Sequence, residues 1–218
     1  MNNVIIAIDG QASTGKSTQA KKIADNLSIN YRDSGAYYRA ITLYLLNSNI
    51  KHDLKISQEI LDQISIRQDY KKGNFRIFLN DDDVTNKVRG HKVSLSVSNY
   101  AKKPEIRKFV FDQLRKSAES KSLVVDGRDI GTVVFPDANF KFFLIAKPRI
   151  RAERRHKQID DDSVKVHIIE EEIKIRDKTD STREIAPLRK ADDAFKIDVS
   201  DLTIDEVFNK ILQKIKSD

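Results

Sequence analysis

The stretch that most constrains the fold is VIIAIDGQASTGKSTQA, residues 4–20. An apolar run rich in β-branched residues leads directly into GQASTGKS, which contains two of the chain's seven glycines. The run has the length and composition of a strand buried on both faces of a sheet. Residues 10–17 fit the pattern GxxxxGK[ST], which is meaningful only between a strand and a helix. A strand, a phosphate-binding loop and a helix are therefore predicted in that order.

This loop predicts a nucleotide-binding site. Gly10 and Gly15 let the backbone turn its N–H groups onto phosphate oxygens, and the following helix adds the positive end of its dipole. Lys16 would span the β- and γ-phosphates, and the Ser17 hydroxyl would be a ligand of Mg²⁺. An ordinary glycine turn before a helix would leave the lysine unexplained. We expect ATP to contact these residues: Gly10, Gln11, Ala12, Ser13, Thr14, Gly15, Lys16, Ser17 and Thr18.

The rest of the chain predicts a three-layer αβα sandwich with a parallel sheet. Strand-like runs occur as LVV before Asp126, FKFFLIA at residues 140–146 and FKID at residues 195–198. Helical patterns lie between them, at residues 17–27, 36–46, 104–120, 149–158, 164–177 and 204–216. Strands that alternate with helices are typical of this α/β fold.

One segment departs from the alternation. The runs ISIRQD, YKKG and NFRIFLN, followed by DDDVT, predict an antiparallel hairpin with a third short strand. We therefore expect a small antiparallel β insertion at about residues 62–100. The acidic run DDDS at residues 160–163 is interpreted as a turn between two charged helices and not as a metal site.

Composition limits the classes of partner. The 40 Lys and Arg against 33 Asp and Glu give a formal charge of +7, which favours anionic partners. Aromatic residues make up only 7% and tryptophan is absent, which argues against single-stranded nucleic acid. The chain has no cysteine, which excludes disulfides and thiolate-bound zinc, and its four histidines are scattered. Without a long apolar stretch or a secretory leader, we expect a cytoplasmic protein that does not enter a membrane.

Charged residues suggest the chemistry. Asp126 follows an apolar strand, a position suited to a carboxylate that orders Mg²⁺-bound water. Phosphoryl transfer between two anions needs positive charge around the moving group, which guanidinium groups supply. Asp177 and Asp180 could hold neighbouring arginines in place or contact a sugar, whereas Arg149 and Arg151 are expected on a solvated helix face. Arginines are dense in the C-terminal part of the chain: Arg149, Arg151, Arg154, Arg155, Arg176, Arg183 and Arg189.

The chain resembles the bacterial cytidylate kinases, within the nucleoside monophosphate kinases. The similarity covers nearly the whole chain, through IAIDG, YRDSGAYYRA, DGRDIGTVVFPDA, RRHKQ, IRDKTDSTREIAPL and ADDAFKIDVSDLTIDEV. The block at residues 126–138 and the RD..DSTR..APL run separate this family from adenylate and thymidylate kinases better than the loop does. The loop reads GQASTGKS where the family commonly has GPSGAGKG, and KPRIRAERR departs from a more acidic start. Both loops satisfy the phosphate-loop geometry.

The resemblance implies one domain with three parts. The core would comprise about residues 1–61, 101–148 and 178–218, the monophosphate-binding insertion residues 62–100, and a helical lid residues 149–177. Cytosine would be read by Ser34, Arg107 and Asp129. An alternative is that Asp129 only pins its neighbour Arg128.

The resemblance also assigns the remaining site residues. The monophosphate would be held by Arg39, Arg128 and Arg183. The ribose would lie near Ser98, Arg176 and Asp180, and ATP would be covered by Arg154 and Arg155. Charge in the transition state would be stabilised by Lys16, Arg128, Arg176 and Arg183. Magnesium would be bound by Ser17 and, through water, by Asp126.

The expected reaction is direct, Mg²⁺-assisted transfer from ATP to CMP or dCMP, giving ADP and CDP or dCDP. No general base is needed, because the acceptor is already a phosphate anion. The partners would be these nucleotides, without nucleic acid or membrane, and the protein would be a monomer. A related kinase acting on UMP or shikimate is one alternative, and a regulatory nucleotide switch or nucleic-acid-dependent ATPase is another. A GTP switch would carry NKxD, whereas TNKV at residues 85–88 lacks the final aspartate.

Overall fold

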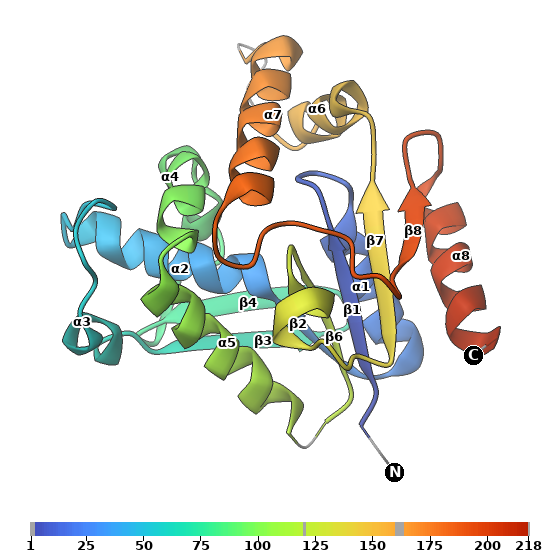
Figure 1. The fold of residues 1–218 in the computed structure, drawn as a ribbon, viewed down its shortest axis with the longest axis horizontal. Coiled ribbons are helices and arrows are strands. Elements are labelled where there is room, and N and C mark those ends of the chain that lie inside the picture. The colour runs from blue at the N-terminus through green and yellow to red at the C-terminus, as the bar shows by residue number, and fades with distance from the viewer. Residues whose placement is uncertain (1–2, 120, 160–163, 218) are drawn as a thin grey trace.

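A five-stranded parallel sheet forms the centre of the molecule (Figure 1). The structure, a computed structural model, describes residues 3–119, 121–159 and 164–217. In the order β2-β6-β1-β7-β8, the strands are β2 (Asn30–Asp33), β6 (Leu123–Gly127), β1 (Ile5–Gly10), β7 (Phe140–Ile145) and β8 (Phe195–Asp198). The predicted parallel sheet is confirmed. Strand β2 was not predicted, because its sequence NYRD is short and polar.

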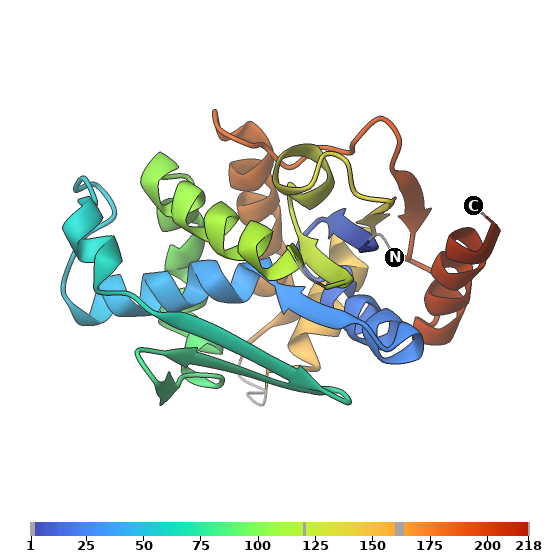
Figure 2. The ribbon, with the colours of Figure 1, turned by 90° about the horizontal axis from the view of Figure 1, so that it is seen from below.

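Helices cover both faces of this sheet. On one face α1 (Lys16–Leu27) packs against α8 (Ile204–Ser217), and on the other lie α5 (Pro104–Ala118) and the π-helical turn η2 (Ile130–Val134) (Figure 2). The core between them includes Ile6, Ile8 and Val124, which are fully buried. All the helices predicted from the sequence are present, with ends that differ by a few residues.

The insertion begins with the predicted hairpin. Strands β3 (Ile66–Lys71), β4 (Asn74–Leu79) and β5 (Asp82–Asp83) form a three-stranded antiparallel sheet, which confirms that prediction. Lys72 and Gly73 have φ of 47° and 79°, the positive angles that a tight two-residue hairpin turn requires. Gln68 links the hairpin to the main sheet, since its side chain accepts a hydrogen bond from Asp33 N (3.0 Å) and donates one to Asp33 O (2.7 Å).

The second half of the insertion is helical, which the sequence analysis did not predict. It consists of η1 (Lys87–Arg89) and α4 (His91–Ala101), and α4 packs against α2 (Ser34–Asn47). A further short helix, α3 (Gln58–Asp62), lies before the hairpin. The sequence of α4 is rich in serine and valine, which have weak helix propensity. Burial of Val93, Val97 and Tyr100, spaced along one helix face, outweighs that propensity.

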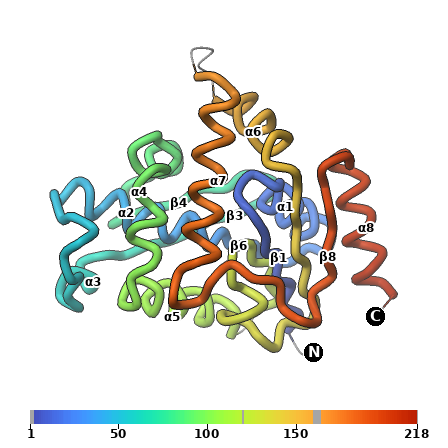
Figure 3. Tube along the Cα trace, turned by 45° about the horizontal axis from the view of Figure 1, so that its top comes forward, coloured from blue at the N-terminus to red at the C-terminus, as the bar shows by residue number. Residues whose placement is uncertain are grey.

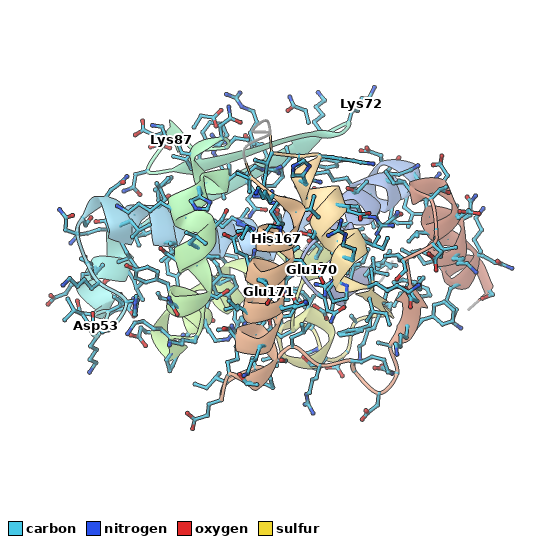
Figure 4. The ribbon with its side chains drawn as sticks, turned by 90° about the horizontal axis from the view of Figure 1, so that it is seen from above. Asp53, Lys72, Lys87, His167, Glu170 and Glu171 are labelled. Carbon is cyan, nitrogen blue, oxygen red and sulfur yellow. The ribbon has the colours of Figure 1, made fainter. Side chains whose placement is uncertain are left out.

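Two helices rise beyond the carboxyl ends of the strands. They are α6 (Pro148–His156) and α7 (Val166–Thr182), and α7 lies between α4 and α6 when seen from above (Figure 4). Because α7 extends to Thr182, it carries Asp180 in the same helix as Arg176 and crosses the expected lid boundary at residue 177. The DDDS run lies outside the described residues. Within the described ranges, no helix combines the length and apolar character needed to cross a membrane.

Candidate active site

The loop between β1 and α1 lies at the carboxyl end of the sheet, beside α7 (Figure 3). Gly10 has a φ of 146°, and a Cβ there would lie 2.1 Å from the carbonyl oxygen of Leu144 in β7. Only glycine allows this approach. Gly15, with a φ of 85°, precedes the first residue of α1. The loop therefore leaves the sheet and presents the start of α1 as the phosphate-loop pattern predicts.

Lys16 is almost completely buried in this loop, with 5% of its surface exposed. Its Nζ donates to the carbonyl oxygen of Gln11 (2.6 Å) and to Thr14 Oγ1 (3.4 Å). Burial lowers the pKa of Lys16, and the nearby Arg128 and Arg176 lower it further. A buried lysine with two further cations nearby, at the first position of a helix, is arranged to meet an anion.

Ser17 and Asp126 bring oxygen ligands together. Ser17 Oγ donates to Asp126 Oδ2 (2.8 Å), and the hydroxyl of Tyr31 donates to Asp126 Oδ1 (2.7 Å). Burial raises the pKa of Asp126 to about 6, and the charge of Asp33 raises it in the same direction. A hydroxyl beside a carboxylate suits Mg²⁺, which prefers oxygen ligands and usually keeps several waters. Among the described residues no group of three or more histidine, cysteine, aspartate or glutamate side chains could hold a metal ion.

A second site lies between α2, α4, α7 and the end of β6. It is a cavity of about 50 Å³, and every predicted substrate-binding residue except Arg39 and Arg107 lines it. Tyr38 of α2, which was not singled out from the sequence, also lines this cavity. The cavity is lined by Ser34, Gly35, Tyr38, Val97, Ser98, Ala101, Gly127, Arg128, Asp129, Arg176, Asp180 and Arg183.

Asp129 is held by two arginines. Arg107, which is 1% exposed, donates to Asp129 Oδ2 and to the carbonyl oxygen of Ala101 (2.9 Å). Arg183 donates to Asp129 Oδ1 (3.2 Å) and through Nε to Ala186 O (2.6 Å). The alternative that Asp129 pins Arg128 is wrong, because Arg128 donates to Asp180 Oδ2 instead (3.0 Å).

Around the cavity, the charge of Asp180 is balanced by arginines, whereas the Nε of Arg176 has no hydrogen-bond partner among the described residues. Burial opposes the charge on Asp180, yet Arg128, Arg176 and Arg183 hold its pKa below the usual value. Burial lowers the pKa of Arg176 to about 9, and the charges of Arg39 and Arg128 add to this effect. The Nε of Arg176 is buried and has no hydrogen-bond partner in the part of the chain that the structure describes. A buried guanidinium N–H without a partner is suited to bind an anion.

The arginines of α6 divide into different environments. Arg154 donates to the carbonyl oxygens of Val199 (2.7 Å) and Leu202 (3.4 Å), beyond β8. Arg155 is half-buried, and burial together with the charge of Arg89 lowers its pKa. Burial and the charge of Arg89 also lower the pKa of Arg39, together with other neighbouring charges. Arg89 in η1 thus joins a cluster of cations that the sequence analysis did not identify.

Arg149 and Arg151 differ sharply. Arg149 is 57% exposed and pairs with Glu153, as expected for a solvated face. For Arg151 that expectation is wrong, because the residue is 1% exposed and forms an ion pair with Asp177. Two positions apart on a helix, the side chains point in different directions, and only Arg151 faces the phosphate loop.

Asp9 is a further buried carboxylate that the sequence analysis did not single out. Its Oδ1 accepts from Ile130 N (2.9 Å) and its Oδ2 accepts from Gly131 N (2.7 Å). These bonds fix the start of η2, directly after Asp129. Burial raises the pKa of Asp9 to about 7, against the effect of the two N–H groups.

Comparison with known proteins gives a consistent family match. The family model described as Cytidylate kinase matches residues 6–217. The cytidylate kinase of Thermosipho melanesiensis is 43% identical over 213 residues, which cover 97% of this chain and 96% of that protein. The cytidylate kinase of Clostridioides difficile is 43% identical over 217 residues, 99% of each chain. A solved gluconokinase from Sinorhizobium meliloti, 12% identical, shares the fold with a TM-score of 0.53 over 99% of this chain and 93% of that one.

Proposed function

The chain belongs to the cytidylate kinase family, and we propose that it transfers the terminal phosphoryl group of ATP to the phosphate of CMP or dCMP. An oxygen of the acceptor phosphate forms a bond to the γ-phosphorus. The bond from that phosphorus to the bridging oxygen breaks, and ADP leaves with its electron pair. Because the acceptor oxygen is already anionic, the protein has to position and neutralise the reactants without removing a proton.

The observation that carries this proposal is the shared set of cations between the loop and the cavity. Arg128 and Arg176 line the cavity and also lie close enough to Lys16 to lower its pKa, in addition to the larger effect of burial. A donor phosphate on the loop and an acceptor phosphate in the cavity would therefore meet at the same positive charges. That is the arrangement that stabilises a transferring phosphoryl group.

On the donor side, loop N–H groups and Lys16 would bind the phosphates of ATP. Ser17 and, through water, Asp126 would hold Mg²⁺, and their distance of 2.8 Å supports this pairing. The ion would neutralise phosphate charge when bound. Arg154 and Arg155 would contact ATP from α6. In this structure Arg154 bonds the segment after β8.

On the acceptor side, Arg39, Arg128 and Arg183 would bind the monophosphate, and Ser98, Arg176 and Asp180 would lie near the ribose. The unpartnered Nε of Arg176 supports a contact with a phosphate oxygen. Ser34, Asp129 and Arg107 would read cytosine, with Arg107 acting from behind Asp129.

Substrate entry requires the cavity to widen. Its volume of about 50 Å³ is well below the roughly 300 Å³ at which small-molecule pockets begin. One wall comes from α4 in the insertion and another from α7. We therefore propose that the insertion at about residues 62–100 moves relative to the core to admit CMP.

A coupled assay of ADP release tests this function. With ATP and Mg²⁺, we expect rapid ADP release when CMP or dCMP is added, slower release with UMP and none in excess chelator. Faster turnover of UMP would identify a related kinase with another acceptor. ADP release that depends on added nucleic acid instead would overturn the proposal.

We also propose that the protein is a cytoplasmic monomer that acts in pyrimidine nucleotide metabolism. The cavity and the loop are both formed by residues of a single chain, which supports function without a second copy. Sedimentation velocity with and without nucleotides would test the monomeric state.

A further inference from the structure

A buried ion pair connects the phosphate loop to the two helices beyond the sheet. Arg151 in α6 and Asp177 in α7 form this pair, with side chains 2% and 12% exposed. Arg151 also donates through Nε to the carbonyl oxygen of Ala146 (2.9 Å), at the end of β7. Its guanidinium is thus held by Asp177 and by Ala146 O, in addition to its contact with the loop.

Both backbone polar groups of Ala12 are bonded to this pair. Ala12 N donates to Asp177 Oδ1 (3.0 Å), and Arg151 Nη1 donates to Ala12 O (3.1 Å). Asp177, Arg151 and Ala12 therefore form a closed ring of hydrogen bonds. The orientation of the peptide groups around Ala12, in the middle of the phosphate loop, depends on two side chains more than 130 residues away.

Apolar contacts reinforce the ring. The side chain of Ala12 packs in a small buried cluster with Ala152 of α6 and with Ile169 and Ile173 of α7. This cluster is separate from the main core. The loop is consequently seated against α6 and α7, in addition to its attachment to β1 and α1.

The same stretch of α7 also reaches the acceptor cavity. Arg176 and Asp180 line that cavity, whereas Asp177, next to Arg176, holds Ala12. A shift of α7 would therefore change the loop and the cavity together. A buried ion pair contributes little net stability compared with apolar side chains, so geometry is the property that this pair is suited to provide.

We infer that Arg151 and Asp177 are positioning residues that hold the phosphate loop at Ala12 in the geometry that binds the triphosphate and align it with the acceptor site. The inference rests on the proposed function only for the identity of the two nucleotides. Neither side chain has to touch ATP. Their effect is transmitted through the Ala12 backbone.

The test compares Asp177→Asn, Arg151→Met and the double variant with wild type. The dissociation constant of ATP is measured by calorimetry without acceptor, KM is measured for ATP and CMP, and Tm is measured by thermal unfolding. Each single variant leaves a buried charge or donor without its partner and should lower Tm. Loss of a charge-assisted bond at the loop should weaken ATP binding by about tenfold or more, with a smaller change in the KM for CMP.

The double variant separates positioning from stability. It removes both charges, so Tm should recover in part while ATP affinity stays low. Recovery of ATP affinity together with Tm would overturn the inference, as would unchanged ATP affinity in a folded single variant. Arg149→Met is the matched control, because it breaks an exposed ion pair in the same helix and should leave ATP affinity unchanged.

The calorimetric arm also separates this inference from the proposed function. A wild-type protein that binds ATP but does not phosphorylate CMP would contradict the function, and the ATP affinities of the variants would still decide the role of the pair. If the single variants do not fold, Arg151→Lys provides the test. Lysine keeps the charge but cannot reproduce the planar fork that bonds Ala146 and Ala12 at once, so ATP affinity should still fall.

Discussion

The carboxylate of Asp129 is paired with the guanidinium of Arg107, and neither side chain is more than 5% exposed. Arg183 occupies the other carboxylate oxygen. A carboxylate has about four acceptor positions, so Asp129 can bind both arginines and still accept from a cytosine amino group. The two roles weighed for Asp129, holding an arginine and reading the base, are thus compatible, although the arginines are Arg107 and Arg183.

Asp129→Ala should reduce kcat/KM for CMP far more than for UMP. The cytosine amino group would lose its acceptor, whereas the uracil oxygen at the same position is opposed by the wild-type carboxylate. Stability should also fall, by about 3–5 kcal/mol, because Arg107 would remain buried without its partner. Steady-state kinetics with both nucleotides and denaturant unfolding measure these effects. If a folded variant keeps the wild-type ratio of kcat/KM for CMP to kcat/KM for UMP, Asp129 does not read the base and has only a structural role.

Arg183→Ala should raise the KM for CMP strongly and leave ATP affinity nearly unchanged. Arg183→Lys should restore the KM for CMP poorly. A guanidinium can bond Ala186 O, Asp129 and a phosphate with separate N–H groups in one plane, and a single ammonium cannot reproduce that geometry. Unlike Asp129→Ala, both changes should affect CMP and UMP alike, since the two share the same phosphate. Equal losses of ATP and CMP affinity in a folded variant would point to a general structural role.

Lys16→Ala should lower kcat by at least about a hundredfold, a loss typical of one removed electrostatic donor. The fold should survive, because burial and nearby arginines already disfavour the charge of Lys16. Single-turnover measurements at saturating ATP and CMP, with Tm as the folding control, test this expectation. Activity within a few fold of wild type would contradict a role for Lys16 in the transfer step.

The phosphate loop and the parallel sheet could be predicted because their signals are local. An apolar run, a glycine loop and a helix pattern follow one another within residues 4–27. The pairing of the charged side chains could not be predicted in this way. Arg149 and Arg151 have the same chemistry and nearly the same sequence context, and only the packing of α6 against Ala12 makes one exposed and the other buried.

The carboxylates illustrate the same limit. Asp126, Asp129 and Asp180 were singled out by motif, but the hydrogen-bond donors to their carboxylates lie 22 to 109 residues away and are set by the fold. Asp9 ends an apolar strand and has no local signal at all, since its partners are backbone N–H groups more than 120 residues later. Family resemblance identified the side chains that gather around the cavity, but not the pairs that they form.

Asp9 gives the chain a pH-dependent contribution to stability. Its pKa in the folded protein is about 7, raised by burial, against 3.8 for an ordinary aspartate. Between about pH 4 and pH 7 the folded state therefore binds a proton that the unfolded state has released. Stability from this group is fully present at low pH and declines as pH rises towards 7, by at most about 1.4 kcal/mol per pH unit.

Asp9→Asn should remove this slope. The amide cannot accept from both Ile130 N and Gly131 N as the carboxylate does, so the variant should lose one of these bonds, and position 9 should add no pH dependence to its stability. The difference in unfolding free energy between wild type and variant should shrink from pH 4 to pH 7 and stay constant above it. The charges of Asp129 and Lys16, which also act on Asp9, are present in both proteins, so contributions from other groups largely cancel in this difference. Denaturant unfolding at several pH values measures it, and a difference that is flat from pH 4 to pH 8 would show that Asp9 titrates normally.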